Sequence, residues 1–82
     1  MARVTVYGKL SCGDTQRSRR LLDAHRIEYQ WVDVEQSAQG RRIAMEKNQG
    51  RLSTPTIVFD DGSALVEPSD EQLAKKLNIR LL

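Results

Sequence analysis

The chain contains one cysteine, Cys12, and the residues around it determine what its thiol can do. The surrounding segment, residues 6–25, reads VYGKLSCGDTQRSRRLLDAH, which is typical of a strand, a short turn and a helix. Cys12 is expected at the N-terminus of that helix, where backbone N–H groups lack partners within the helix. Such a position favours the thiolate, so Cys12 is a candidate nucleophile.

Two charged neighbours act on this thiol in opposite directions. Lys9 lies three residues before Cys12 and favours the thiolate, whereas Asp14 disfavours a second negative charge and competes for the same N–H groups. We therefore expect a moderately lowered pKa for Cys12 at most. The alternative is that Cys12 is an inert small hydrophobic residue, because free cysteines are often buried.

The third residue after Cys12 is Thr15, where many redox sites carry a second cysteine. A lone cysteine cannot close a disulfide within its own chain. A redox site here would therefore work with one thiol, and a former redox site reused for another purpose is the alternative.

Periodicity and turn signals predict seven elements that would position this site. Strands are predicted at residues 3–7, 28–34, 56–60 and 63–66, and helices at residues 13–25, 38–48 and 70–77. Ser37 is a plausible helix N-cap, Asp61-Gly62 is a strong hairpin signal, and Ser69 with Gln72 forms a capping box.

The order β-α-β-α-β-β-α predicts an α/β fold with a mixed four-stranded sheet flanked by three helices. The first two strands are joined through a helix and should be parallel, while the last two should form an antiparallel hairpin. With 82 residues, we expect one domain over residues 1–82.

Composition excludes several classes of function. The net charge is +2, and arginines cluster near residues 17–20 and 41–42, but acidic residues are spread through the chain and aromatic residues are few. We therefore expect solvated helix faces and no nucleic-acid partner.

No apolar run approaches a membrane span, and the N-terminal MARVTVYGK has no signal-peptide core. With one cysteine, these features predict a cytoplasmic protein without a membrane partner.

Three segments then carry a family resemblance: YGKLSCGDT after the first strand, STPT before the third, and DDGSALVEPSD leading into the last helix. In this order and spacing the chain resembles the glutaredoxins, small proteins of thioredoxin-like fold. The resemblance extends over nearly all 82 residues. The last segment looks most like the mycoredoxin-like branch of bacterial glutaredoxins.

The resemblance implies roles for the residues of the first two segments. Cys12 matches the family's nucleophile, with Thr54 and Pro55 matching the pair whose proline is cis. The backbone of Thr54 would face the sulfur and pair with a bound thiol. The loop around the nucleophile comprises Ser11, Gly13, Asp14 and Thr15.

Three further residues match the positions that hold a small thiol. Ser69 and Asp70 match the helix N-terminus that holds the γ-glutamyl end of glutathione, which suits a carboxylate ligand. Asp70 would face the ligand's ammonium group, and Lys9 matches the residue near the other carboxylate. Arg17 supports the thiolate or ligand, or else is a plain surface arginine, and we leave it outside the predicted site.

The resemblance predicts a thiol-disulfide oxidoreductase, with roles in electron transport and redox homeostasis. Because Thr15 replaces a resolving cysteine, we expect a monothiol route that reduces mixed disulfides between proteins and a low-molecular-weight thiol. Glu67-Pro68 stands where many glutathione users have glycine and cysteine, so glutathione, mycothiol and bacillithiol all remain candidate co-substrates. We expect no permanently bound cofactor, disulfide-containing protein partners and a monomer.

Two other functions stay open. A single cysteine per chain suits an iron–sulfur cluster carrier bridged between two chains, although CGDT differs from the CGFS-like site of that branch. A redox-inactive thioredoxin-fold binding module is the other, suggested by Asp14 and Thr15. We expect no metal site of the chain's own, because its sequence has no cluster of cysteine and histidine.

Overall fold

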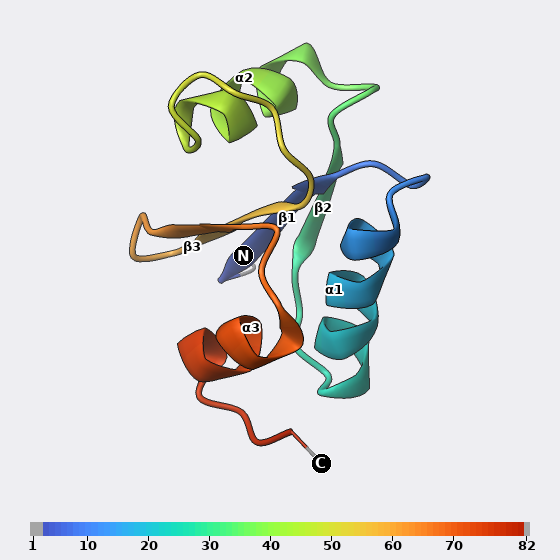
Figure 1. Cartoon of the computed structure of the whole chain (residues 1–82), viewed down its shortest axis with the longest axis vertical. Coiled ribbons are helices and arrows are strands. Elements are labelled where there is room, and N and C mark those ends of the chain that lie inside the picture. The colour runs from blue at the N-terminus through green and yellow to red at the C-terminus, as the bar shows by residue number, and fades with distance from the viewer. Residues whose placement is uncertain (1–2, 82) are drawn as a thin grey trace.

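The computed structural model describes residues 3–81 and contains the seven predicted elements in the predicted order (Figure 1). The elements are β1 (Val4–Gly8), α1 (Gly13–Ala24), β2 (Gln30–Asp33), α2 (Ala38–Glu46), β3 (Thr56–Phe59), β4 (Ala64–Val66) and α3 (Asp70–Leu77).

The four strands form one mixed sheet in the order β2-β1-β3-β4. β1 is parallel to β2, and β3 is antiparallel to both β1 and β4, as the connections predicted. In this register Thr56, the first residue of β3, pairs with Tyr7 near the end of β1 and with Val66 at the end of β4. The end of β1, the start of β3 and the end of β4 therefore lie together at one end of the sheet.

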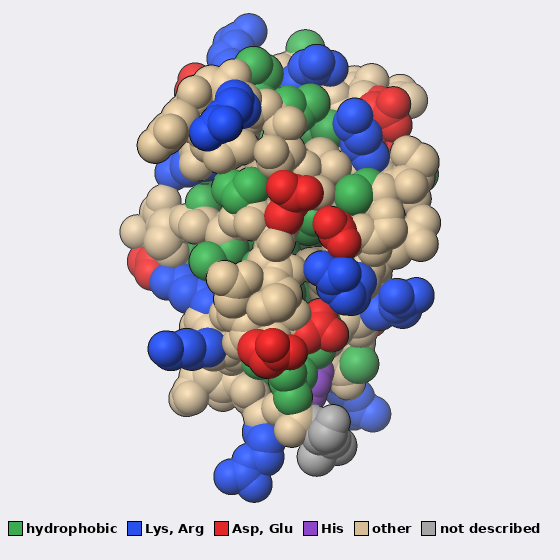
Figure 2. Space-filling view, viewed as in Figure 1, with side chains coloured by type: hydrophobic (Ala, Val, Ile, Leu, Met, Phe, Trp, Pro, Cys, Tyr) green, Lys and Arg blue, Asp and Glu red, His purple; other side chains and the backbone are tan. Residues whose placement is uncertain are grey.

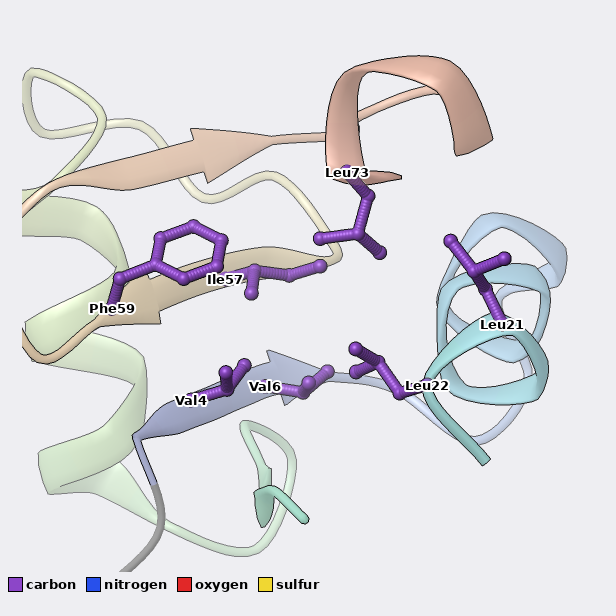
Figure 3. Close-up of a cluster of buried hydrophobic side chains, with 7 residues drawn as sticks. All are labelled: Val4, Val6, Leu21, Leu22, Ile57, Phe59 and Leu73. Atoms are coloured by element: carbon purple, nitrogen blue, oxygen red, sulfur yellow. The ribbon is translucent and has the colours of Figure 1, made fainter. Parts of the chain in front are cut away.

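Apolar side chains cover both faces of this sheet. On one face, seven buried side chains from β1, β3, α1 and α3 point toward one another (Figure 3): Val4, Val6, Leu21, Leu22, Ile57, Phe59 and Leu73. On the other face, Tyr7 and Val34 pack with Ala44 of α2. Helices α1 and α3 thus cover one face and α2 the other, which confirms the predicted thioredoxin-like α/β fold.

The hairpin between β3 and β4 is tied to α3. Gly62 adopts a φ of +86°, the left-handed conformation that the Asp61-Gly62 turn signal requires. Lys76 of α3 places its Nζ 2.7 Å from Asp61 Oδ2 and lies over the Phe59 ring. The hydrogen bond from Lys76 holds the pKa of the Asp61 carboxyl well below its usual range.

Some predicted boundaries differ by one or two residues, and hydrogen bonding accounts for the following differences. The helix predicted over residues 38–48 ends at Glu46, because the N–H groups of Asn48 and Gly50 both turn back to the Met45 carbonyl. The strand predicted over residues 28–34 is paired only over Gln30–Asp33. Gly8 pairs with Asp33 and so belongs to the first strand, which was predicted to end at residue 7.

The surface carries charges of both signs. On the face drawn in Figure 2, acidic and basic side chains are interspersed rather than separated into two patches. None of the helices within residues 3–81 has the length and apolar character needed to cross a bilayer.

Gly8 is a close contact between the sheet and the start of α1. A Cβ atom at Gly8 would lie 2.6 Å from Thr15 Cγ2 and 2.8 Å from Thr15 Oγ1. We expect Gly8→Ala to lower the free energy of unfolding by about 1–3 kcal/mol through overpacking, measured by urea denaturation. Gly13→Ala is the matched control, because a Cβ there would meet nothing within 4 Å. Equal stability of the two variants would show that the contact is not tight.

Candidate active site

Three segments meet at the end of the sheet that the register defines. They are the loop of residues 9–12 after β1, residues 53–55 before β3, and residues 67–70, which lead into the start of α3. The Glu67 N–H donates to the Pro55 carbonyl at 2.8 Å, and the Cys12 thiol donates to the Thr54 carbonyl across 3.4 Å. The candidate nucleophile is thus in contact with a segment 42 residues away in the sequence.

Local hydrogen bonds fix Cys12 as the N-cap of α1, as predicted. Its backbone is extended, its N–H donates to the Lys9 carbonyl at 3.1 Å, and its carbonyl accepts from Gln16 N–H at 3.1 Å. The Gln16 side chain also donates to the Leu10 carbonyl at 2.7 Å, which ties the loop to the helix. Cys12 is only half-buried, and the flanking Ser11 and Gly13 are exposed. A disulfide in solution can therefore approach the sulfur.

The surroundings of Cys12 favour its thiolate. Burial raises the pKa of the Cys12 thiol. Hydrogen bonds that its ionised sulfur would accept from the Thr15 and Thr54 side chains and from the N–H groups of Thr15 and Asp14 lower the pKa by more, so the balance is a lowered pKa. In the thiol form the Cys12 side chain donates to the Thr54 carbonyl and forms no capping hydrogen bond. The expected lowering is confirmed, and its cause is hydrogen bonding rather than the charges of Lys9 and Asp14.

Asp14 is paired with Arg17, which explains why its carboxylate does not oppose the thiolate. Arg17 Nη1 donates to Asp14 Oδ1 at 3.0 Å, Nη2 donates to the Pro68 carbonyl at 3.4 Å, and Nε lies 3.8 Å from Asp70 Oδ1. One guanidinium therefore joins the first two turns of α1 to the start of α3 and offsets two carboxylates.

The sequence left open whether Arg17 supports the site or is a plain surface arginine. The signal that could have found it is its spacing of three residues from Asp14, because residues i and i+3 share one helix face. Its contacts with Pro68 and Asp70 depend on tertiary structure and had no local signal.

The Thr54-Pro55 peptide bond is cis, as the resemblance implied. The Thr54 carbonyl faces the Cys12 sulfur, so the expected juxtaposition of this backbone with the thiol is confirmed. Thr56, the next residue along the chain, holds this segment in place, because its buried hydroxyl donates to the Ser53 carbonyl at 2.8 Å.

Some of the polar groups at the start of α3 are already hydrogen-bonded to one another. Ser69 accepts from Gln72 N–H at 3.1 Å, and its own N–H donates to Gln72 Oε1 at 2.8 Å, which confirms the predicted capping box. The N–H groups of Asp70 and Glu71 remain the donors of the first turn that a ligand can use. The carboxylate of Asp70 lies beside Arg17, and the half-buried Lys9 lies in the Cys12 loop.

Comparison with known proteins agrees with this geometry. The sequence model of the glutaredoxin family matches residues 4–63. A protein of Mycobacterium tuberculosis that is named as a glutaredoxin is 36% identical over 76 residues, which covers 93% of this chain and 90% of that protein. The chain belongs to the glutaredoxin family.

Solved structures share the fold. A mutant form of a thioredoxin-like protein superimposes with a TM-score of 0.81 at 28% identity, covering 98% of this chain and all of that one. Methanoredoxin of Methanosarcina acetivorans gives a TM-score of 0.84 at 19% identity, over 95% of this chain and 86% of that one. The glutaredoxin of Methanosarcina mazei gives 0.82 at 19% identity, over 95% and 80%.

Membership of the glutaredoxin family establishes the general chemistry. Glutaredoxins are thiol-disulfide oxidoreductases that act on disulfide-containing proteins together with a low-molecular-weight thiol such as glutathione, and the single Cys12 is consistent with that activity. The matched region includes the cysteine loop and the cis-proline segment, while α3 lies outside it.

The pairing of Asp14 with Arg17 can be tested through the thiol. In Arg17→Ala the Asp14 carboxylate loses its counter-charge, so we expect the pKa of Cys12 to rise and its alkylation at neutral pH to slow by about twofold. The pH dependence of iodoacetamide alkylation measures this change.

Arg20→Ala is the matched control, because Arg20 is an exposed arginine on the same helix. An unchanged Cys12 pKa in Arg17→Ala would show that Asp14 does not act on the sulfur even when unpaired. Equal shifts in both variants would point instead to general loss of positive charge.

Proposed function

We propose that this glutaredoxin reduces mixed disulfides between proteins and a low-molecular-weight thiol by a monothiol mechanism in which Cys12 is the only protein nucleophile. The observation that carries this proposal is the half-buried Cys12 sulfur at the N-terminus of α1, where hydrogen bonds lower its pKa. Thr15 occupies the place from which a second thiol would attack.

The reaction then consists of two thiol-disulfide exchanges. The Cys12 thiolate attacks the small-thiol sulfur of the mixed disulfide, and the protein sulfur leaves as a thiolate that takes up a proton. Cys12 is now disulfide-bonded to the small thiol. A second small thiolate attacks that small-thiol sulfur, which regenerates the Cys12 thiolate and releases the small thiol as its disulfide.

The residues around Cys12 suggest how the small thiol is held. The backbone of Thr54, which precedes Pro55 and faces the sulfur, would pair with the backbone of a bound peptide-like thiol. The first turn of α3, beginning at Ser69 and Asp70, offers N–H donors and a positive dipole end to an anionic group. Lys9 would meet a second carboxylate from the opposite side.

Charge at the start of α3 bears on which thiol is used. Asp70 and Glu71 lie in its first turn and the exposed Glu67 precedes it, while Arg17 is already engaged with Asp14 and Asp70. These carboxylates oppose an incoming carboxylate. We therefore propose that a thiol with fewer negative charges than glutathione, such as mycothiol, is used at least as well as glutathione. Bacillithiol, which carries carboxylates as glutathione does, would then have no advantage over glutathione.

The other two functions receive less support. A lowered Cys12 pKa is a property that a redox-inactive binding module does not need. A cluster shared by two chains would draw on Cys12 of each chain, but CGDT at residues 12–15 differs from the CGFS-like site of the cluster-carrying branch.

A turnover assay with mixed-disulfide substrates tests the proposed function. The purified protein should reduce a mixed disulfide between a peptide and a small thiol with that thiol as reductant, and Cys12→Ser should abolish turnover because no other thiol is present. Glutathione, mycothiol and bacillithiol are compared at equal concentration. No turnover above the uncatalysed rate with any of them would contradict the proposal.

A further inference from the structure

Thr15 is a buried residue whose hydroxyl forms no hydrogen bond within the described part of the fold. Its side chain is completely buried, and its Oγ1 has no hydrogen-bond partner among the described residues. A buried hydroxyl without a partner costs about 1–3 kcal/mol, so such groups call for an explanation. In the first turn of a helix, a threonine hydroxyl usually bonds to nearby backbone, and this one does not.

Packing gives this hydroxyl one fixed position. Thr15 lies against Gly8 of β1, where a single added carbon would come within 2.8 Å of both Cγ2 and Oγ1. The branched side chain has few rotamers within a helix, and the contact with β1 restricts it further. Cys12 is the N-cap of α1 and Thr15 is the third residue of its first turn, so both belong to the N-terminal end of this helix.

We propose that Thr15 replaces the absent resolving cysteine with a thiolate-stabilising hydroxyl, which donates its hydrogen to the Cys12 sulfur only when that sulfur is ionised. This inference deepens the proposed monothiol function and rests on it. In the thiol form Cys12 donates to the Thr54 carbonyl, and the Thr15 hydroxyl is left unpaired. On ionisation the sulfur loses its hydrogen and becomes an acceptor, so the buried hydroxyl gains a partner.

Such a hydrogen bond would serve both exchange steps. It raises the fraction of Cys12 that is ionised at neutral pH before the first attack. In the second step Cys12 is the leaving group, and a more stable thiolate leaves faster. A monothiol enzyme relies on this second step, because no neighbouring cysteine is present to expel the small thiol.

Other groups around Cys12 also act on its ionisation. The charged side chains on the adjoining segments are Lys9 in the loop, Asp14 and Arg17 on α1, Asp70 at the start of α3 and the exposed Glu67 before it, while residues 53–55 bring none. Asp14 and Asp70 are both offset by Arg17. The Thr54 side chain is a second hydroxyl donor to the sulfur. The contribution of Thr15 must therefore be isolated by changing its hydroxyl alone.

Two substitutions, Thr15→Val and Thr15→Ser, separate the effect of the hydroxyl from that of the methyl group. Valine keeps the branched shape and removes the hydroxyl, whereas serine keeps the hydroxyl and removes the methyl group. The pKa of Cys12 is measured from the pH dependence of iodoacetamide alkylation and from the ultraviolet absorbance of the thiolate. We expect Thr15→Val to slow alkylation at neutral pH at least about threefold and to raise the alkylation midpoint. Thr15→Ser should stay close to the native protein.

The stability of the two variants towards urea also separates the proposed role from a purely structural one. If the Thr15 hydroxyl served only the fold, its removal would lower stability. Because Thr15→Val removes an unpaired buried hydroxyl, it should unfold at the same or a higher urea concentration than the native protein at a pH where Cys12 is protonated. Thr15→Ser should unfold at a lower concentration, since it loses a buried methyl group. The variant with the weaker thiolate would thus be the more stable one.

Two results would overturn the inference: a Cys12 pKa that is unchanged in Thr15→Val, or one that rises equally in Thr15→Ser. If Thr15→Val fails to fold, Thr15→Ala replaces it in the same comparison with Thr15→Ser. Alkylation does not require any small-thiol substrate. A failure of native turnover would therefore contradict the proposed function, while the pKa comparison alone decides the role of Thr15.

Discussion

The pairing of Thr56 with Tyr7 on one side and Val66 on the other is the constraint on which the site depends. It brings the end of β1, the start of β3 and the end of β4 to one end of the sheet, where the adjoining loops and the first turns of α1 and α3 carry the proposed functional residues. Thr56 is fully buried and also holds the preceding segment through the Ser53 carbonyl. A slip of one residue in this register would turn the inward side chains of β3 to the opposite face and move the Thr54 carbonyl away from Cys12.

The order of elements and most of the site were predictable because their signals are local. The capping box of Ser69 and Gln72 and the turn at Gly62 are properties of a few consecutive residues, and both are present. The cis bond before Pro55 was implied by the family resemblance alone. Arg17 could not be placed, because its contacts with Pro68 and Asp70 join segments more than 50 residues apart. The burial of Thr15 against Gly8 likewise depends on how α1 docks on the sheet.

The absence of a second cysteine changes what the surrounding residues have to provide. In a site with two thiols, the second can expel a bound substrate, whereas here the Cys12 thiolate must be stable enough to leave by itself. The structure supplies neutral hydrogen-bond donors for this purpose, from two threonine side chains and the first turn of α1, and it offsets the nearby Asp14 with Arg17. Asp14 therefore remains in the first turn of α1 without opposing ionisation, while its partner Arg17 links α1 to the start of α3.

The central claim is that the fold, and not the intrinsic acidity of cysteine, makes Cys12 reactive. The most direct test is the rate of Cys12 alkylation as a function of pH, measured on the native protein and again in urea, where the same thiol has lost its hydrogen-bond donors. The account predicts a native midpoint clearly below the unfolded one, which should lie near the ordinary thiol value of about 8.5. A native midpoint at or above the unfolded one would mean that burial outweighs the hydrogen bonds, and it would contradict the account.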